Sequence, residues 1–106
     1  MIGRGTGKTL AMVKALPEEG AVVIVHSAVM RDYVLRMIHD VRGDAVRKAC
    51  KIVVIQRHAD LGYLECLRRE TFVDHAFYET CLDFHLGDKL KVLVDQINVR
   101  LPRRAP

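Results

Sequence analysis

The sequence is poor in cysteine and proline, has no tryptophan and contains no long hydrophobic run. Its three cysteines, Cys50, Cys66 and Cys81, are an odd number without C-x-x-C spacing, which argues against a disulfide framework and a zinc ribbon. The longest apolar runs, residues 21–25 and 52–55, are far shorter than the roughly 20 residues that a membrane-spanning helix needs. We therefore expect a cytoplasmic protein with no membrane role.

Composition predicts a folded domain of modest positive charge. Half of the 106 residues are hydrophobic and 28% are charged, which suffices for a hydrophobic core. Lys and Arg exceed Asp and Glu by 17 to 13, and this charge of +4 is spread along the chain, so it permits a nucleic-acid partner without requiring one. We assign residues 1–101 to a single domain and residues 102–106 to a basic C-terminal tail.

Three short segments have the pattern of β-strands. Residues 21–26 and 51–56 are rich in Val and Ile and lack polar alternation, which is typical of parallel strands that are buried on both faces. Residues 71–75 form a third candidate. These segments predict a small, mostly parallel sheet.

Helical segments alternate with the strands. The clearest has an apolar stripe from Val29 to Val41, with Ser27 as the predicted N-cap and Gly43 as the predicted end. The last helix is expected to begin at Asp88, after Gly87, and to end at Leu101. Other helical segments are expected at residues 9–16, 44–50 and 59–67.

This alternation predicts an α/β fold, a small three-layer domain with three to four mostly parallel strands. Because crossovers between parallel strands are right-handed, we expect helices on both faces of the sheet. Ligands of such open sheets bind at the carboxyl ends of the strands.

The most informative segment is the first nine residues, Met-Ile-Gly-Arg-Gly-Thr-Gly-Lys-Thr. This glycine-rich turn, which leads into Gly-Lys-Thr at the start of a helix, resembles the Walker A loop of P-loop NTPases. The resemblance implies that Gly5, Thr6 and Gly7 cradle phosphates with their backbone N–H groups. It implies further that Lys8 binds the β- and γ-phosphates and that Thr9 offers its hydroxyl to Mg²⁺.

A second segment extends the resemblance. The third predicted strand ends in Asp74, and Asp74-His75-Ala76 resembles the opening of the DEAD/DEAH box of superfamily 1 and 2 helicases. The whole chain is then similar to the first two-thirds of a RecA-like ATPase domain. The resemblance implies ATP and Mg²⁺ as cofactors, Lys8 and Asp74 as catalytic residues, and Thr9 and Asp74 as the metal site.

The chain departs from the family pattern in ways that suggest a truncated or degenerate member. Ile2 stands where the pattern has its first glycine, and only two residues precede Gly3, so the first strand is short or missing. His75 replaces the catalytic glutamate, and Glu79 could take its place only if the chain folds back toward the γ-phosphate. In a plainer interpretation, residues 3–7 are a flexible arm and Asp74 is a turn or capping aspartate after a strand.

Two functions follow from these observations. The first is a nucleoside triphosphate-binding P-loop protein, with ATP favoured by the resemblance and with weak or partner-dependent hydrolysis. The alternative is a catalytically inactive, P-loop-derived binding protein that docks on a larger protein or nucleic-acid complex, as phage accessory or inhibitor proteins do. A missing first strand would expose a sheet edge to a partner or to a second copy. ATP versus GTP, the partner and the oligomeric state stay open.

Overall fold

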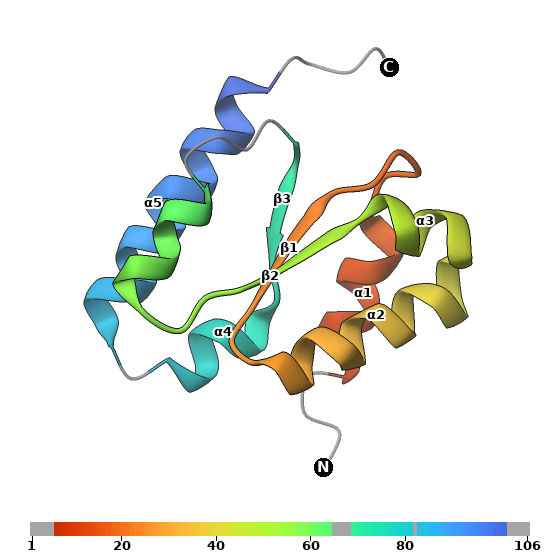
Figure 1. The fold of residues 1–106 in the computed structure, drawn as a ribbon, viewed down its shortest axis with the longest axis horizontal. Helices are drawn as coiled ribbons and strands as arrows, with labels where there is room; N and C mark the ends of the chain where they lie inside the picture. The colour runs from red at the N-terminus through yellow and green to blue at the C-terminus, as the bar shows by residue number, and fades with distance from the viewer. Residues whose placement is uncertain (1–5, 65–68, 82, 102–106) are drawn as a thin grey trace.

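The structure is a computed structural model that describes residues 6–64, 69–81 and 83–101. Its centre is a parallel sheet of β1 (Val22–Val25), β2 (Lys51–Val54) and β3 (Thr71–Val73), in the order β2-β1-β3 (Figure 1). Strand β1 lies in the middle and is buried along its whole length. The predicted α/β class and the parallel pairing are thus confirmed.

One face of the sheet is covered by α1 (Thr6–Ala15), α2 (Ala28–Arg42) and α3 (Asp44–Ala49), on the right in Figure 1. Alternate residues of β1 point to this face, as the two-residue period of a strand requires. The buried core on this side consists of Val13, Leu16, Ala21, Val23, Val25, Val34, Ile38 and Val46.

Helix α2 begins and ends as the sequence predicts. The Ser27 hydroxyl oxygen accepts a hydrogen bond from the N–H of Met30 at 3.1 Å, and Gly43 ends the helix with a φ of +94°. Near its end, the Arg42 guanidinium donates hydrogen bonds to three carbonyls at the end of α1 and just beyond it, among them that of Val13. This contact fixes α1 against α2.

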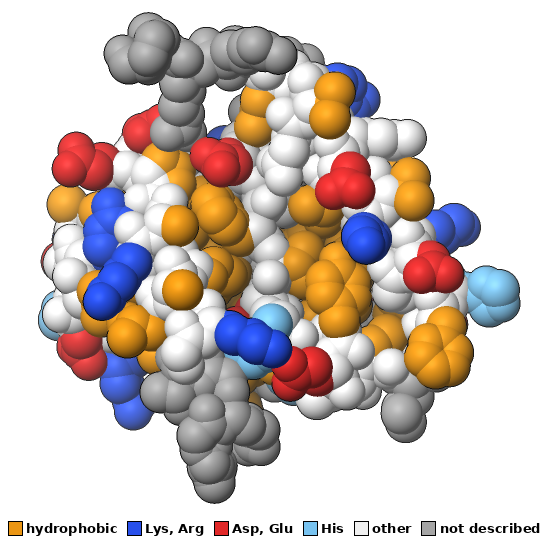
Figure 2. All heavy atoms as spheres, turned by 180° about the vertical axis from the view of Figure 1, so that it is seen from behind, with side chains coloured by type: hydrophobic (Ala, Val, Ile, Leu, Met, Phe, Trp, Pro, Cys, Tyr) orange, Lys and Arg blue, Asp and Glu red, His pale blue; other side chains and the backbone are white. Residues whose placement is uncertain are grey.

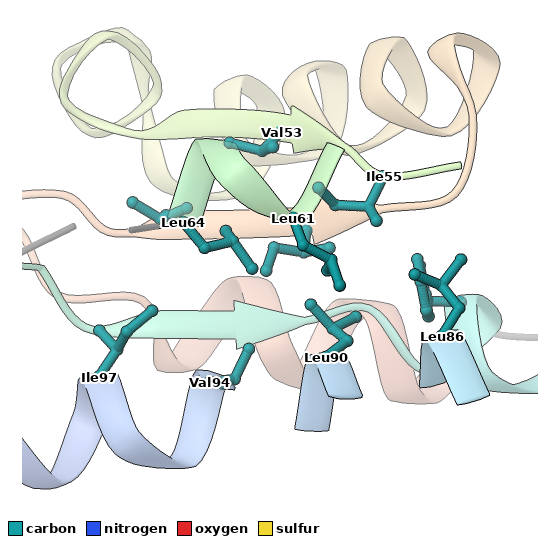
Figure 3. Close-up of a cluster of buried hydrophobic side chains, with 11 residues drawn as sticks. Val53, Ile55, Leu61, Leu64, Leu86, Leu90, Val94 and Ile97 are labelled. Atoms are coloured by element: carbon teal, nitrogen blue, oxygen red, sulfur yellow. The ribbon is translucent and has the colours of Figure 1, made fainter. Parts of the chain in front are cut away.

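The opposite face is covered by a 3₁₀-helix, η1 (His58–Leu64), and by α4 (His75–Thr80) and α5 (Phe84–Arg100). Figure 3 shows the buried side chains of α5 pointing toward the strands and η1. The labelled residues of this second core are Val53, Ile55, Leu61, Leu64, Leu86, Leu90, Val94 and Ile97. Helices therefore lie on both faces, as predicted.

The start of α5 differs from the prediction. Helix α5 begins at Phe84 rather than Asp88, because Asp83 is the N-cap and accepts the N–H of Leu86 at 3.1 Å. That hydrogen bond, with a further contribution from His58, holds the pKa of the Asp83 carboxyl below its usual value. The buried Leu86 extends the apolar stripe of α5 backward, which outweighs the low helix propensity of Gly87.

Strand β3 forms one edge of the sheet. Residues 70 and 74 bond to β1, so the backbone groups of Thr71 and Val73 point away from it. The Asn98 side chain of α5 takes the place of a neighbouring strand at Thr71, accepting its N–H at 2.8 Å and donating to its carbonyl at 3.0 Å. The predicted short or missing first strand concerns residues 1–5, which lie outside the described residues.

Gly20 lies where the turn before β1 meets the end of α3. Its φ is +94°, and a Cβ atom built on it would lie 2.1 Å from the Ala49 carbonyl oxygen. Gly43 has the same φ, but apart from its chain neighbours no atom of the described residues lies within 4 Å of its Cβ position. An added Cβ atom would therefore cause backbone strain at both glycines but steric overlap only at Gly20.

We predict that Gly20→Ala destabilises the protein more than Gly43→Ala does. Strain alone should lower the free energy of unfolding of Gly43→Ala by about 1–3 kcal/mol, whereas Gly20→Ala must also displace the Ala49 carbonyl. Urea unfolding of both variants measures the difference. Equal losses would show that the turn before β1 is looser than described.

Candidate functional site

The sequence-predicted residues Thr9 and Asp74 lie in direct contact. Thr9 is in the second turn of α1, and Asp74 follows β3 at the carboxyl end of the sheet. The Thr9 hydroxyl donates a hydrogen bond of 2.8 Å to Asp74 Oδ1, across 65 positions of sequence. Both residues are buried, with exposed fractions of 1% and 0%. The fold thus brings together two residues that the motif analysis assigned to one metal site.

The carboxylate of Asp74 is held from several directions. Its second oxygen, Oδ2, accepts a hydrogen bond from the N–H of Ala76 at 3.2 Å and so caps α4. The backbone N–H of Asp74 donates to the carbonyl of Ile24 at 3.0 Å. The plainer interpretation, a capping aspartate, is therefore correct for one oxygen. The other oxygen faces Thr9, which a capping role alone does not require.

Lys8 precedes Thr9 in α1, and among the described residues its ammonium pairs with the carboxylate of Glu79. Its side chain is 71% exposed, and its Nζ lies 3.5 Å from Glu79 Oε2 on α4. The sequence analysis considered Glu79 only on the condition that the chain folds back toward the γ-phosphate, and the structure places its carboxylate near Lys8, the residue that the resemblance assigns to that phosphate. No sequence signal predicted the contact, because the two residues are 71 positions apart and α4 was not predicted.

His75 lies between the two carboxylates without bonding to either. Its Nδ1 is 3.7 Å from Asp74 Oδ1, and its Nε2 is 3.8 Å from Glu79 Oε2, both beyond hydrogen-bond distance. The Nδ1 atom is buried and has no hydrogen-bond partner among the described residues. The ring is thus close to the site, but the hydrogen bonds that hold Asp74 come from other groups.

The remaining loop residues are only partly described. Gly5 lies outside the described residues, as does Gly3, while Thr6 and Gly7 form the start of α1. Gly7 is exposed, and a Cβ atom there would meet nothing within 4 Å. Because the first backbone N–H groups of a helix have no partner within the helix, this end of α1 is favourable for an anion beside Lys8.

The donor set suits magnesium better than a transition metal. Across residues 6–64, 69–81 and 83–101, no group of three or more His, Cys, Asp and Glu side chains is arranged to hold a metal. The Thr9 hydroxyl and the Asp74 carboxylate offer hard oxygen ligands. Mg²⁺ is commonly bound by one or two such protein groups together with phosphates and water. These two residues therefore fit Mg²⁺ that arrives with a phosphate ligand.

A separate cavity of about 370 Å³ lies near the carboxyl ends of β1 and β2, and Ile55, Phe77 and Leu86 form part of its lining. His26 also lines it, and its Nδ1 is a buried atom without a partner in the described part of the chain. The sequence analysis gave His26 no role, although its place directly after β1 puts it at the ligand-binding end of the sheet.

Comparisons with protein-family models, with curated proteins and with solved structures find no match to this chain. The assignment of the site therefore rests on the geometry of its own residues. In the described ranges, no helix is both long enough and apolar enough to span a membrane.

We predict that Thr9→Val lowers the free energy of unfolding by about 1–3 kcal/mol, because it leaves a buried oxygen of Asp74 without its donor. Thr9→Ser retains the hydroxyl and should cost clearly less. Urea unfolding of the two variants is the measurement. Equal stability of the valine and serine variants would contradict the hydrogen bond to Asp74.

Proposed function

We propose that this chain binds a nucleoside triphosphate with Mg²⁺ at the start of α1, as a degenerate P-loop protein of RecA-like type. The observation that carries the proposal is the buried contact between Thr9 and Asp74 beside an exposed Lys8. Hydrolysis is weak or depends on a partner. ATP is favoured over GTP by the resemblance to helicases alone.

Each residue has a role that its chemistry supports. Lys8 offers an exposed cationic side chain to the β- and γ-phosphates, and the N–H groups at the start of α1, which have no partner within the helix, add partial positive charge. Thr9 and Asp74 supply oxygen ligands for Mg²⁺, which neutralises phosphate charge when bound. Because Asp74 follows a parallel strand, this arrangement lies where open α/β sheets bind ligands.

We expect weak hydrolysis because His75, and not a glutamate, follows Asp74. A carboxylate is expected there to orient the attacking water, and this chain has His75. Its ring is mostly buried, with 17% of the side chain exposed. We therefore expect turnover to require a group that a partner supplies.

We predict that Mg²⁺–ATP raises the melting temperature of the protein and that Lys8→Ala abolishes this rise. Ligand at about ten times its Kd stabilises the native state by about 1.4 kcal/mol, which corresponds to roughly 5–10 °C for a domain of this size. Lys14→Ala is the matched control, since it removes the same charge from the last turn of the same helix. GTP is tested in parallel.

A rise in the wild type that is lost in Lys8→Ala and kept in Lys14→Ala supports the proposal. The absence of any rise with either nucleotide contradicts it. A rise that survives in Lys8→Ala would place the ligand at another site.

The second candidate function is docking on a larger complex, and the outer edge of β3 favours it. The N–H and C=O of Val73 point outward and have no hydrogen-bond partner among the described residues. Figure 2 shows the face on this side of the sheet, where hydrophobic side chains gather in a hollow between the α1 side and the α5 side. A partner or a second copy could add a strand there. This candidate predicts no nucleotide-dependent rise, and slow exchange of the Val73 amide hydrogen once the edge is covered.

A further inference from the structure

Glu79 lies on α4, the helix that Asp74 of the candidate site caps. This helix begins directly after Asp74 and is anchored to the core by Phe77, a residue only 2% exposed. The Glu79 carboxylate oxygen Oε2 lies 3.5 Å from Lys8 Nζ and 3.8 Å from His75 Nε2. Lys8, the residue that the proposed function assigns to phosphates, is therefore already paired with an anion of the protein itself.

We propose that Glu79 is a specificity-determining residue that competes with the terminal phosphates of the ligand for Lys8. The inference rests on the proposed function and adds a discrimination among ligands that share a base and sugar. A phosphate oxygen that reaches the Lys8 ammonium must displace the carboxylate or remain beside it, and two anions a few ångströms apart repel each other.

The competition depends on how many phosphates the ligand has. The γ-phosphate, and to a lesser degree the β-phosphate, meets Lys8 and therefore Glu79, whereas a monophosphate ends before it reaches either group. Glu79 thus weakens the binding of ATP most, that of ADP less and that of AMP not at all.

The expected gain in ATP affinity on removal of the Glu79 charge depends on how exposed the Lys8 and Glu79 side chains are. The side chains of Lys8 and Glu79 are 71% and 50% exposed, so water screens their attraction. Removing the carboxylate should therefore tighten ATP binding by about two- to fivefold, the range that an exposed ion pair supports.

The test is the affinity of Mg²⁺–ATP, Mg²⁺–ADP and AMP for the wild type and for Glu79→Gln, measured by isothermal titration calorimetry. Glutamine keeps the shape of the side chain and removes only its charge. Glu18→Gln is the matched control: Glu18 is an exposed residue beyond the opposite end of α1, and its substitution changes the net charge of the protein by the same amount. The melting temperature of each variant confirms that it is folded.

The proposal expects Glu79→Gln to bind ATP about two- to fivefold more tightly, AMP with unchanged affinity, and Glu18→Gln to behave as the wild type. Equal ATP affinity in Glu79→Gln and the wild type would overturn the competition and leave the nucleotide site intact. Weaker ATP binding in Glu79→Gln would overturn it as well, since Glu79 would then assist the ligand.

Two further outcomes also decide the matter. Equal tightening in Glu18→Gln and Glu79→Gln would overturn the local competition, because net charge alone would then explain the gain. Failure of every protein, wild type included, to bind any of the ligands would overturn the proposed function itself, and Glu79 would then have no ligand with which to compete.

Discussion

The hydrogen bond between the Thr9 hydroxyl and the Asp74 carboxylate is the contact on which the rest of the site depends. It joins the beginning of the chain to the end of β3 inside a region with almost no solvent exposure. A buried carboxylate is costly unless donors surround it, and Asp74 has them in Thr9 and in the N–H of Ala76. Through Ala76 the same carboxylate also starts α4, and α4 carries Glu79 to Lys8. One side chain therefore contacts Thr9, caps α4 and thereby helps to position the Glu79 carboxylate beside Lys8.

The sheet that supports this contact is small, and its stability depends on β1. Its two neighbours, β2 and β3, are both edge strands, and each face of β1 contributes to a separate hydrophobic core. At the β3 edge, Asn98 satisfies one residue's backbone groups and leaves those of Val73 without a partner in the described part of the chain. Edges of this kind pair readily with other strands, so a partner that docks on β3 would lie next to Asp74, the residue that follows this strand. The two proposed functions, nucleotide binding and docking, would for this reason involve the same part of the sheet.

Much of the fold was predictable because local chemistry decides it. The Val- and Ile-rich segments without polar alternation indicated buried strands, and β1 is buried along its whole length. The Ser27 side chain caps the start of α2, and Gly43 ends the helix with a positive φ. The predicted start of α5 at Asp88 was wrong. Asp83 and Asp88 can both cap a helix, and the burial of Leu86 favours Asp83. Helix α4 was missed, since six residues are too few to show an apolar stripe. The proximity of Thr9 to Asp74 followed from a motif, whereas the contact between Lys8 and Glu79 depends on packing that no local pattern encodes.

The central claim is that Thr9 and Asp74 hold the divalent metal of a bound nucleotide, and paramagnetic broadening by Mn²⁺ tests it most directly. Mn²⁺ takes oxygen ligands in the same octahedral geometry as Mg²⁺ and broadens the NMR signals of nearby nuclei. In the presence of ATP, substoichiometric Mn²⁺ should broaden the amide signals of Thr9 and Asp74 first and leave that of Gly43, at the far end of α2, sharp. Broadening that is strongest elsewhere, for example at the exposed carboxylate of Asp44, would contradict the account.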